Sequence, residues 1–326
     1  MRFGAFVPQG WRMDLVGIPP ERHWETIRSV AGAIERSGYD SLWVYDHFHT
    51  TPLPSQEATH EAWALMAALA AATTRVRLGQ MCTCVAYRPP AYLAKVAATV
   101  DVISGGRLNL GIGAGWYQHE YEGYGYEFPR PAARIAQLRE ALEIMRRMWT
   151  EDEVHFDGKH YRVQGAICRP KPIQQPYIPI WVAGGGEQLT LRVAARYASH
   201  TNFGPTPEEF ARRSAVLAEH CREAGTDFEA IVRSTNRFAV CRATEREVQE
   251  VLSAIQDRYR RVVPEEQAER ATAVYREMAG TPEQLIERLR PWAAAGLGYA
   301  IIYFPTAAYD PTDLELFARE VAPTFA

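Results

Sequence analysis

The sequence is poor in lysine and lacks the cysteine patterns of disulfide-stabilised or zinc-binding proteins. Only three of its 36 basic residues are lysines, Lys95, Lys159 and Lys171. The five cysteines are an odd number scattered over 326 residues. The one close pair, Cys82 and Cys84, has no second Cys/His pair nearby to complete a tetrahedral zinc site. We therefore expect reduced thiols and no metal site.

Long apolar runs and an excess of positive charge are also missing. No stretch reaches the roughly 18 uncharged apolar residues of a membrane-spanning helix, and a strand-like run begins already at Arg2. The formal net charge of -3 gives no general attraction to nucleic acid or to anionic membranes. These absences predict a cytoplasmic protein that acts on small molecules. The preference for arginine and alanine is typical of a GC-rich bacterial genome.

Short apolar runs, each followed by a helix-periodic stretch, recur along most of the chain. This alternation predicts βα units and a parallel sheet. A chain of 326 residues that is 47% apolar suits one large barrel better than an ordinary single domain. The expected strands are residues 3–7, 38–48, 75–81, 107–112, 178–183, 198–203, 231–241 and 299–304.

The predicted fold is α/β, a single (β/α)8 TIM-type barrel domain over residues 1–326, with insertions after strand 4 and strand 7. Residues 151–177 lack helical periodicity and are too long for an ordinary connection, so we interpret them as an insertion with a short hairpin over one end of the barrel. Extra helices are expected at about 244–279. No linker suggests a second domain.

The second expected strand ends in Asp46 and His47, directly after the apolar run Trp43-Val44-Tyr45. A parallel sheet buries both faces, so a carboxylate and an imidazole at its edge are costly unless water or a ligand needs them. In α/β barrels the carboxyl edge of the strands is where ligands bind. The alternative is that the pair only holds a loop.

Two glycine-rich loops, residues 113–115 and 184–186, directly follow the fourth and fifth expected strands. Glycines let the backbone approach a ligand closely, and amides that lead into a helix can bind a phosphate. The second loop is the better phosphate site, because a periodic helix follows it at once. Either loop can instead be a turn that needs glycine for its backbone angles. Neither is a Walker motif, and no G-x-G-x-x-G fingerprint is complete.

Taken in order, these strand ends resemble the luciferase-like monooxygenase superfamily. The resemblance is carried by WVYDHF at 43–48, LGQMCTCVAYRPP at 78–90, GRLNLGIGAGW at 106–116, IWVAGGG at 180–186 and GTPEQ at 280–284. It implies a TIM-type barrel, usually a homodimer, that binds reduced FMN or the deazaflavin coenzyme F420. The Asp-His pair and the Gly-Ala-Gly-Trp run resemble the F420-dependent branch more than the luciferases.

The resemblance also implies roles for particular residues. In the F420-dependent branch, the residues matching Asp46 and His47 lie near the deazaflavin ring, and the imidazole hydrogen-bonds to substrate or supports hydride transfer. A bulge after strand 3 often carries a non-proline cis peptide at the positions matching Cys84 and Val85, and the strand-5 loop holds the cofactor phosphate. The implied catalytic residues are His47 and Glu120; the implied cofactor contacts are Asp46, Thr83, Cys84, Val85, Gly113, Gly115, His119, Ala183, Gly184, Gly185, Gly186 and Glu187.

The sequence departs from family members that oxidise glucose 6-phosphate. They have a tryptophan where this chain has Thr51, an acid where it has Trp116, and lysines that bind the sugar phosphate. With only three lysines in the chain, these differences argue against that substrate. The aromatic residues between Trp116 and Tyr126 instead predict a larger apolar or aromatic substrate, unless they are plain packing.

The leading hypothesis is an F420-dependent oxidoreductase that transfers a hydride between C5 of the cofactor and a small organic substrate. The alternative is an FMNH2-dependent monooxygenase. A metal-dependent barrel hydrolase is suggested by His47-Phe48-His49, but it needs further ligands at other strand ends. A non-catalytic subunit would not need both Asp46 and His47. We expect a homodimer, for whose packing the alanine-rich residues 62–72 are well suited.

Overall fold

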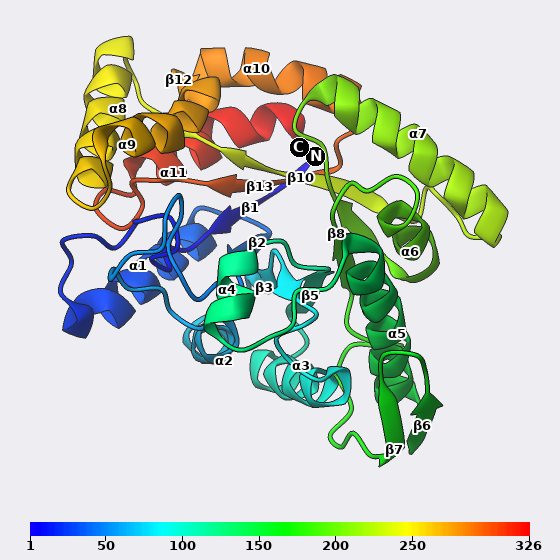
Figure 1. Ribbon diagram of the computed structural model, residues 1–326. Helices are drawn as coiled ribbons and strands as arrows, with labels where there is room; N and C mark the ends of the chain where they lie inside the picture. Colours follow the sequence, from blue (N-terminus) through cyan, green and yellow to red (C-terminus); the bar gives the residue numbers. More distant parts are fainter. The chain divides into compact units, whose positions relative to one another are not determined.

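The computed structural model describes residues 1–326 and divides the chain into two compact units (Figure 1). The first unit contains Met1–Ala62, Pro205–Phe210 and Ser234–Ala326; the second contains Trp63–Gly204 and Ala211–Arg233. Strands and helices alternate along both units. The predicted α/β class is therefore confirmed.

The first unit is built on four parallel strands in the order β2-β1-β13-β10. Ala5 of β1 lies opposite Leu42 of β2 and Ile302 of β13, and all three side chains are fully buried. The strands are β1 (Arg2–Phe6), β2 (Ser41–Val44), β10 (Val232–Phe238) and β13 (Tyr299–Tyr303). The helices are α1 (His23–Arg36), α8 (Glu245–Arg260), α9 (Glu265–Ala273), α10 (Pro282–Ala294) and α11 (Thr312–Leu316).

The second unit has its own parallel strands around β5. Both β3 and β4 pair with β5, which pairs with β8, and β8 pairs with β9. The strands are β3 (Arg77–Gln80), β4 (Thr83–Cys84), β5 (Leu108–Gly113), β8 (Ile180–Ala183) and β9 (His200–Asn202). The helices are α2 (Ala62–Ala72), α3 (Pro90–Ser104), α4 (Gln118–Gly123), α5 (Pro131–Thr150), α6 (Thr190–Tyr197) and α7 (Pro207–Ala224).

Local sequence signals account for several helix ends. Thr244 and Thr281 each form a capping box, in which the threonine side chain and the third helical residue satisfy each other's backbone amides. Pro282 occupies the first position of α10, where its missing N–H costs nothing. Gly105 ends α3 in the left-handed conformation. The helices α5, α7 and α10 begin at prolines 131, 207 and 282, where the sequence predicts helix starts.

Three predicted elements differ from the structure. Residues 117–128, an aromatic and acidic stretch that the sequence predicts to be a loop, contain the helix α4. The predicted seventh strand, 231–241, is split after Phe238, because β11 (Val240–Cys241) leaves the sheet to pair with β12 (Ala279–Gly280). In the predicted insertion at 151–177, β6 (Val154–Asp157) and β7 (Arg162–Ala166) form an antiparallel hairpin; its strands were expected at 154–156 and 160–162, so the second strand begins where the expected one ends.

One face of α2 carries only small side chains. Ala64, Ala67, Ala68 and Ala71, at helical spacings of three and four, are half-buried or exposed, whereas Leu65, Met66 and Leu69 are buried. Such a face permits another helix to approach closely.

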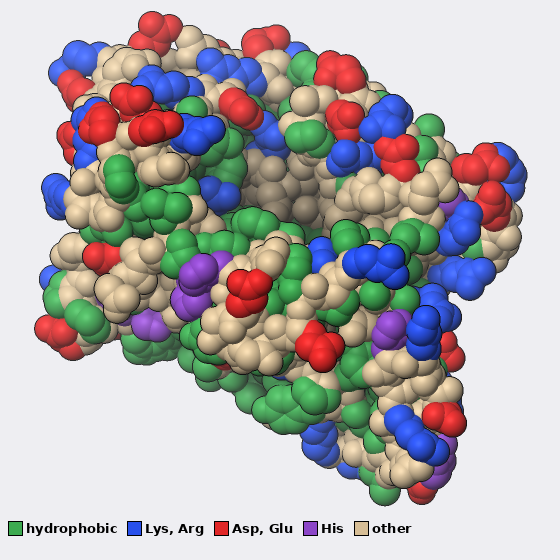
Figure 2. All heavy atoms as spheres, in the orientation of Figure 1, with side chains coloured by type: hydrophobic (Ala, Val, Ile, Leu, Met, Phe, Trp, Pro, Cys, Tyr) green, Lys and Arg blue, Asp and Glu red, His purple; other side chains and the backbone are tan.

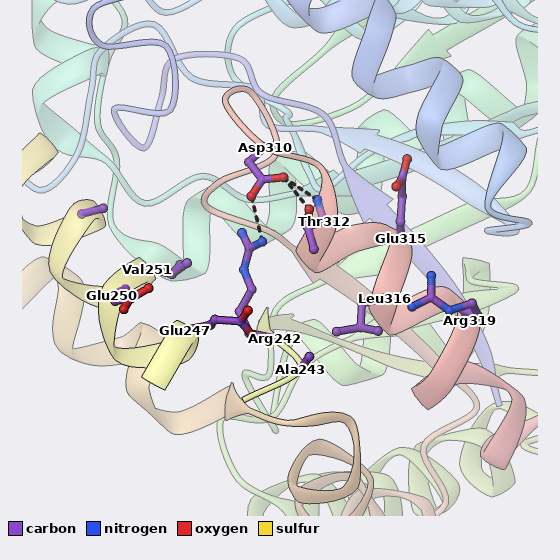
Figure 3. A pocket seen from close by; sticks show the side chains of 11 residues that line it. Arg242, Ala243, Glu247, Glu250, Val251, Asp310, Thr312, Glu315, Leu316 and Arg319 are labelled. Atoms are coloured by element: carbon purple, nitrogen blue, oxygen red, sulfur yellow. Dashed lines mark hydrogen bonds and ion pairs between the residues drawn. The ribbon is translucent and has the colours of Figure 1, made fainter. Parts of the chain in front are cut away.

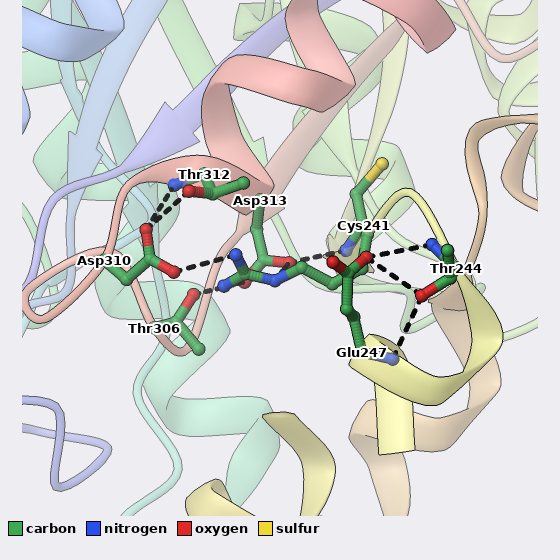
Figure 4. Close-up of polar contacts among 8 residues, drawn as sticks. Cys241, Thr244, Glu247, Thr306, Asp310, Thr312 and Asp313 are labelled. Atoms are coloured by element: carbon green, nitrogen blue, oxygen red, sulfur yellow. Dashed lines mark hydrogen bonds and ion pairs between the residues drawn. The ribbon is translucent and has the colours of Figure 1, made fainter. Parts of the chain in front are cut away.

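A buried ionic network ties α11 to β11 in the first unit (Figure 4). Asp313 has no exposed surface; it accepts a hydrogen bond from the backbone N–H of Cys241 at 2.8 Å and pairs with Arg242, whose Nε lies 3.1 Å from Oδ1. Arg242 also pairs with Asp310 at 2.7 Å. Burial raises the pKa of Asp313 to about 6, against the lowering effect of Arg242. The network therefore joins the segment after β10 to the segment after β13.

A pocket of about 500 Å³ opens beside this network (Figure 3). Its walls come from the start of α8 and from the region of α11 and carry both charges: the basic residues are Arg242 and Arg319, and the acidic residues include Glu247, Glu250 and Glu315. The same mixture continues over the surface of α8 and α9 in Figure 2, where acidic and basic side chains alternate. No helix combines the length and the apolar character needed to cross a bilayer.

Candidate active site

In the first unit, Asp46 and His47 follow the end of β2, as predicted. Asp46 is buried, with 2% of its surface exposed, and His47 is half-buried. The His47 imidazole stacks on the indole of Trp11, with ring centroids 4.2 Å apart and planes inclined by 2°. Trp11 belongs to the segment after β1, so the chain leaving β1 fixes the orientation of a side chain that follows β2.

Gln9 holds the backbone directly before Asp46. Its Oε1 accepts the Tyr45 N–H at 2.8 Å, and its Nε2 donates to the carbonyl oxygens of Tyr45 at 2.7 Å and His60 at 2.6 Å. The Tyr45 ring stacks on Phe6 of β1, with centroids 4.2 Å apart. Sequence reasoning missed Gln9; its only signal is a buried polar residue directly after a strand.

Asp14 anchors the segment after β1 to the end of β13. Its Oδ2 accepts a hydrogen bond from Tyr303 Oη at 2.8 Å, and its Oδ1 accepts the Gly10 N–H at 2.6 Å. Burial raises the pKa of Asp14, although both hydrogen bonds act in the opposite direction. The segment that carries Trp11 is therefore held at defined points on the strand ends of the first unit.

In the second unit, the two neighbouring candidates His119 and Glu120 both lie on α4, but their side chains differ in exposure. Glu120 is fully buried and its Oε2 accepts a hydrogen bond from Tyr87 Oη at 2.8 Å, whereas His119 is exposed. Burial, with added repulsion from Cys84 and Glu120, raises the pKa of Tyr87. The phenol thus stays protonated and donates to the carboxylate. Contact of either candidate with substrate or cofactor stays a prediction.

The irregular segment after β3 is present, but its cis peptide lies elsewhere. The non-proline cis bond joins Met81 and Cys82, so the expectation of Cys84–Val85 was wrong. The physical reason is the strand pairing: Thr83 and Cys84 form β4 and take regular partners on β5, so the irregularity falls before them, between β3 and β4. Thr83, Cys84 and Val85 are all buried, and Cys84 Sγ lies 3.0 Å from Tyr121 Oη.

The glycines of the loop after β5 are required by the protein's own packing. A Cβ on Gly113 would lie 2.7 Å from Cys82 Sγ, and a Cβ on Gly115 would lie 1.9 Å from Tyr121 Oη. Gly115 also has a φ of +76°, which side chains rarely adopt. The turn interpretation therefore accounts for this loop, and its contacts with a cofactor stay a prediction.

The loop after β8, residues 183–187, differs because its amides remain available. Gly184 donates its N–H to Asn202 at 2.9 Å, but the N–H groups of Gly185, Gly186 and Glu187 donate no hydrogen bond within the protein. The helix expected directly after Gly186 begins only at Thr190. These amides therefore lie in an open turn that precedes the helix.

Arginines from α7 surround this loop. A Cβ on Gly185 would lie 2.4 Å from Nη1 of Arg213, so the guanidinium lies directly against the glycine. Arg212 pairs with the Glu187 carboxylate, and His220 Nε2 donates to the Glu187 carbonyl oxygen at 2.8 Å. Amide donors beside a guanidinium fit a phosphate group. Arg213 lies far from the loop in the sequence, which offered no local signal for it.

The remaining sequence candidates can be placed briefly. No group of three or more His, Cys, Asp or Glu side chains is arranged to hold a metal ion. None of the five cysteines forms a disulfide. Of the aromatic residues after β5, Tyr121 is buried, whereas Trp116 and Tyr124 are 60% and 54% exposed.

A family model described as luciferase-like monooxygenase matches residues 1–298. The chain belongs to the luciferase-like monooxygenase family. It is 31% identical over 323 residues to the F420-dependent glucose-6-phosphate dehydrogenase of Nocardia farcinica, covering 90% of this chain and 92% of the relative. The predicted family resemblance is therefore confirmed, and this relative is an oxidoreductase, in agreement with the predicted enzyme class.

Two solved structures of the same fold cover the whole chain. An F420-dependent secondary alcohol dehydrogenase in complex with an F420-acetone adduct matches with a TM-score of 0.79 at 22% identity, covering 100% of this chain and 99% of its own. The monooxygenase RslO1 from Streptomyces bottropensis matches with a TM-score of 0.81 at 21% identity, covering 100% of both chains. The predicted (β/α)8 barrel fold is thereby confirmed.

Proposed function

We propose that this chain is a coenzyme F420-dependent oxidoreductase that transfers a hydride between C5 of the cofactor and a small organic substrate. The observation that carries the proposal is the loop after β8, where the amides of Gly185, Gly186 and Glu187 are available beside Arg213. An F420-dependent dehydrogenase is among the relatives of similar length. When bound, the deazaflavin supplies the hydride chemistry, and the protein supplies binding, orientation and proton control.

In this proposal the loop after β8 binds the cofactor's phosphate. Backbone amides that converge before a helix favour an anion, and Arg213 adds a charge-assisted hydrogen bond. The Glu187 carboxylate, which would repel a phosphate, is paired with Arg212. The loop therefore presents donors while its one acid is neutralised.

His47 is the proposed catalytic residue of the first unit. Its stacking on Trp11 fixes the plane of the imidazole, while its partial exposure leaves it accessible to a ligand. A ring held in this way can hydrogen-bond to a substrate oxygen and donate or orient a proton. Asp46 is proposed to contact the cofactor through its carboxylate or backbone, and Gln9 positions both residues through Tyr45.

We propose an apolar or aromatic substrate. Trp116 is 60% exposed and stacks on Tyr117, with centroids 5.1 Å apart, so these rings are accessible for ligand binding as well as packing. Two of the three lysines are engaged elsewhere: Lys95 donates to the Arg169 carbonyl and Lys171 donates to the Met148 carbonyl. The glucose 6-phosphate of the Nocardia relative is therefore not carried over to this chain.

An FMNH2-dependent monooxygenase is the second candidate. It is favoured by the similarity to RslO1, whose TM-score is as high as that of the F420-dependent alcohol dehydrogenase. The amides after β8 suit the phosphate of FMN as well as that of F420. The two candidates assign the same residues to phosphate binding and differ in the ring system that His47 meets.

Cofactor titration distinguishes the candidates. Apoprotein is titrated with F420, reduced F420, FMN and reduced FMN, and the quenching of tryptophan and cofactor fluorescence gives each Kd. We expect F420 to bind at least tenfold more tightly than FMN, a difference of about 1.4 kcal/mol. Tighter binding of reduced FMN, followed by oxygen consumption with a test substrate, would assign the chain to the monooxygenases instead.

A further inference from the structure

Arg12 places a positive charge at the strand ends of the first unit. Its guanidinium carbon lies 4.7 Å from the centroid of the Trp11 ring and 4.6 Å from that of Phe238, the last residue of β10. The same indole of Trp11 stacks on His47. Arg12 and His47 therefore both contact the same indole ring.

The backbone around Arg12 is held firmly. Its carbonyl oxygen accepts a hydrogen bond from Tyr259 Oη at 2.8 Å, and the preceding carbonyl of Trp11 accepts the Thr51 N–H at 2.9 Å. Tyr259 in turn bonds to Tyr275 at 2.8 Å. The guanidinium is thus presented from a fixed backbone, and little conformational entropy is lost when a ligand binds it.

No carboxylate compensates this charge. Arg12 forms no ion pair, and its Nε is buried without a hydrogen-bond partner. The acid nearest in sequence, Asp14, has its two oxygens engaged by Gly10 and Tyr303. By contrast, Arg237 pairs with Glu277, and Arg242 pairs with two aspartates.

The group nevertheless remains charged. Burial is the largest single effect and acts to lower the pKa of Arg12, but the nearby phenols, among them Tyr275 and Tyr45, together outweigh it, and the net shift is upward. A partly buried cation without a counter-charge is costly unless an anion arrives from outside. Part of the Arg12 surface remains exposed, although its Nε is buried and its side chain hydrogen-bonds to Tyr45.

We propose that Arg12 is the residue that binds an anionic group of the substrate, and that the substrate is a carboxylic acid with an apolar or aromatic body. A guanidinium fork matches the two oxygens of a carboxylate. The faces of Trp11 and Phe238 beside it suit the apolar body of the same molecule. The carboxylate binds next to the indole that orients His47, which places the reacting carbon a few bonds away from the anionic group.

This inference rests on the proposed function for the reaction, but anion binding is measured without cofactor. The probes are 3-phenylpropionate and its neutral amide, 3-phenylpropanamide, titrated into apoprotein by calorimetry. We expect the wild-type protein to bind the acid at least about tenfold more tightly than the amide, the value of one charge-assisted hydrogen bond. In Arg12→Gln this preference should fall to within about threefold.

Two control variants test whether the preference for the acid depends on Arg12 itself or on any arginine of the protein. Arg28→Gln removes an exposed arginine that pairs with Glu25 on α1, and Arg213→Gln removes the charge from the proposed phosphate loop. Both should keep the wild-type preference for the acid. Arg12→Lys, which keeps the charge and disturbs the fold least, should show an intermediate preference, because an ammonium lacks the planar fork.

Four results would overturn the inference, and three of them concern binding of the acid. In the wild-type protein, these are equal binding of the acid and the amide, or no binding of the acid at millimolar concentration. In the variants, it is an unchanged preference for the acid in Arg12→Gln or Arg12→Lys, provided that the variant has the melting temperature of wild type. A fall in F420 affinity of tenfold or more in Arg12→Gln would also overturn it, since Arg12 would then belong to the cofactor site. Failure of F420 to bind wild-type protein would refute the proposed function and leave the acid preference intact.

Discussion

Replacing Gly185 by aspartate tests the loop after β8 most directly. A Cβ at this position would lie 2.4 Å from Nη1, 2.8 Å from Cζ and 3.1 Å from Cδ of Arg213, so the guanidinium must move. These atoms belong to a long flexible side chain, and the displacement should cost little stability. Gly185→Ala therefore displaces the arginine, whereas Gly185→Asp also adds a carboxylate that captures it and repels a phosphate.

The magnitude follows from the interactions removed. A hydrogen bond to a charged group contributes about 1.5–3 kcal/mol, and each 1.4 kcal/mol changes affinity about tenfold. In Gly185→Ala the guanidinium is displaced but not removed and the amides remain, so only part of this contribution should be lost and the affinity for F420 should weaken by up to about tenfold. In Gly185→Asp the added negative charge should weaken the affinity for F420 further, by at least tenfold and up to about a hundredfold.

The assay is fluorescence titration of each apoprotein with F420 at low and high salt. The difference between Gly185→Asp and wild type should shrink at high ionic strength, because salt screens partly exposed charges. Arg222→Gln is the matched control on α7, since Arg222 is exposed and pairs with Glu219. If Gly185→Asp melts like wild type and binds F420 equally well, the loop is only a turn and the phosphate site lies elsewhere.

Three further predictions concern the rest of the chain. His47→Asn should bind F420 within about threefold of wild type but lose about two orders of magnitude or more in single-turnover hydride transfer; an unchanged rate would make His47 structural. Ala68→Glu on the small-residue face of α2 should shift a homodimer to monomers in sedimentation, whereas a wild-type monomer at micromolar concentration would refute the dimer. The pKa of Asp313 is raised in the folded state, so between pH 4 and 6 the folded protein holds this proton more tightly than the unfolded chain does. The free energy of unfolding should therefore fall by up to about 3 kcal/mol as the pH rises from 4 toward 6. Denaturant titrations of Asp313→Asn should lack that component, and an identical pH profile would contradict the assignment.

Local patterns predicted most of the framework. The α5 bounds of 131 and 150 follow from its proline start and its periodicity, and Asp46 and His47 stand out because they end an apolar strand. Such signals are contained within a single segment, so the sequence alone reveals them. The glycine loop after β8 was predicted for the same reason.

What could not be predicted depends on distant contacts. α4 has only six residues and no side-chain cap, and the side chains that it buries, Glu120 and Tyr121, depend on distant partners such as Tyr87 and Cys84. The split of the seventh strand depends on pairing with β12 nearly forty residues further along the chain. Gln9 and Arg213 act on residues 36 and 28 positions away, for which no local pattern gives a signal.

The contact between Gly115 and Tyr121 limits how the loop after β5 can be altered. Because the phenol oxygen occupies the volume of a side chain at position 115, any larger residue there must be accompanied by a smaller one at position 121. Tyr121 Oη also donates to the Ala114 carbonyl at 3.1 Å, so truncating it leaves that carbonyl without this donor. Combinatorial libraries that reshape this region for new substrates should vary positions 114, 115 and 121 as one unit. Libraries that randomise position 115 alone should yield mostly variants in which Tyr121 is displaced and the backbone at position 115 is strained.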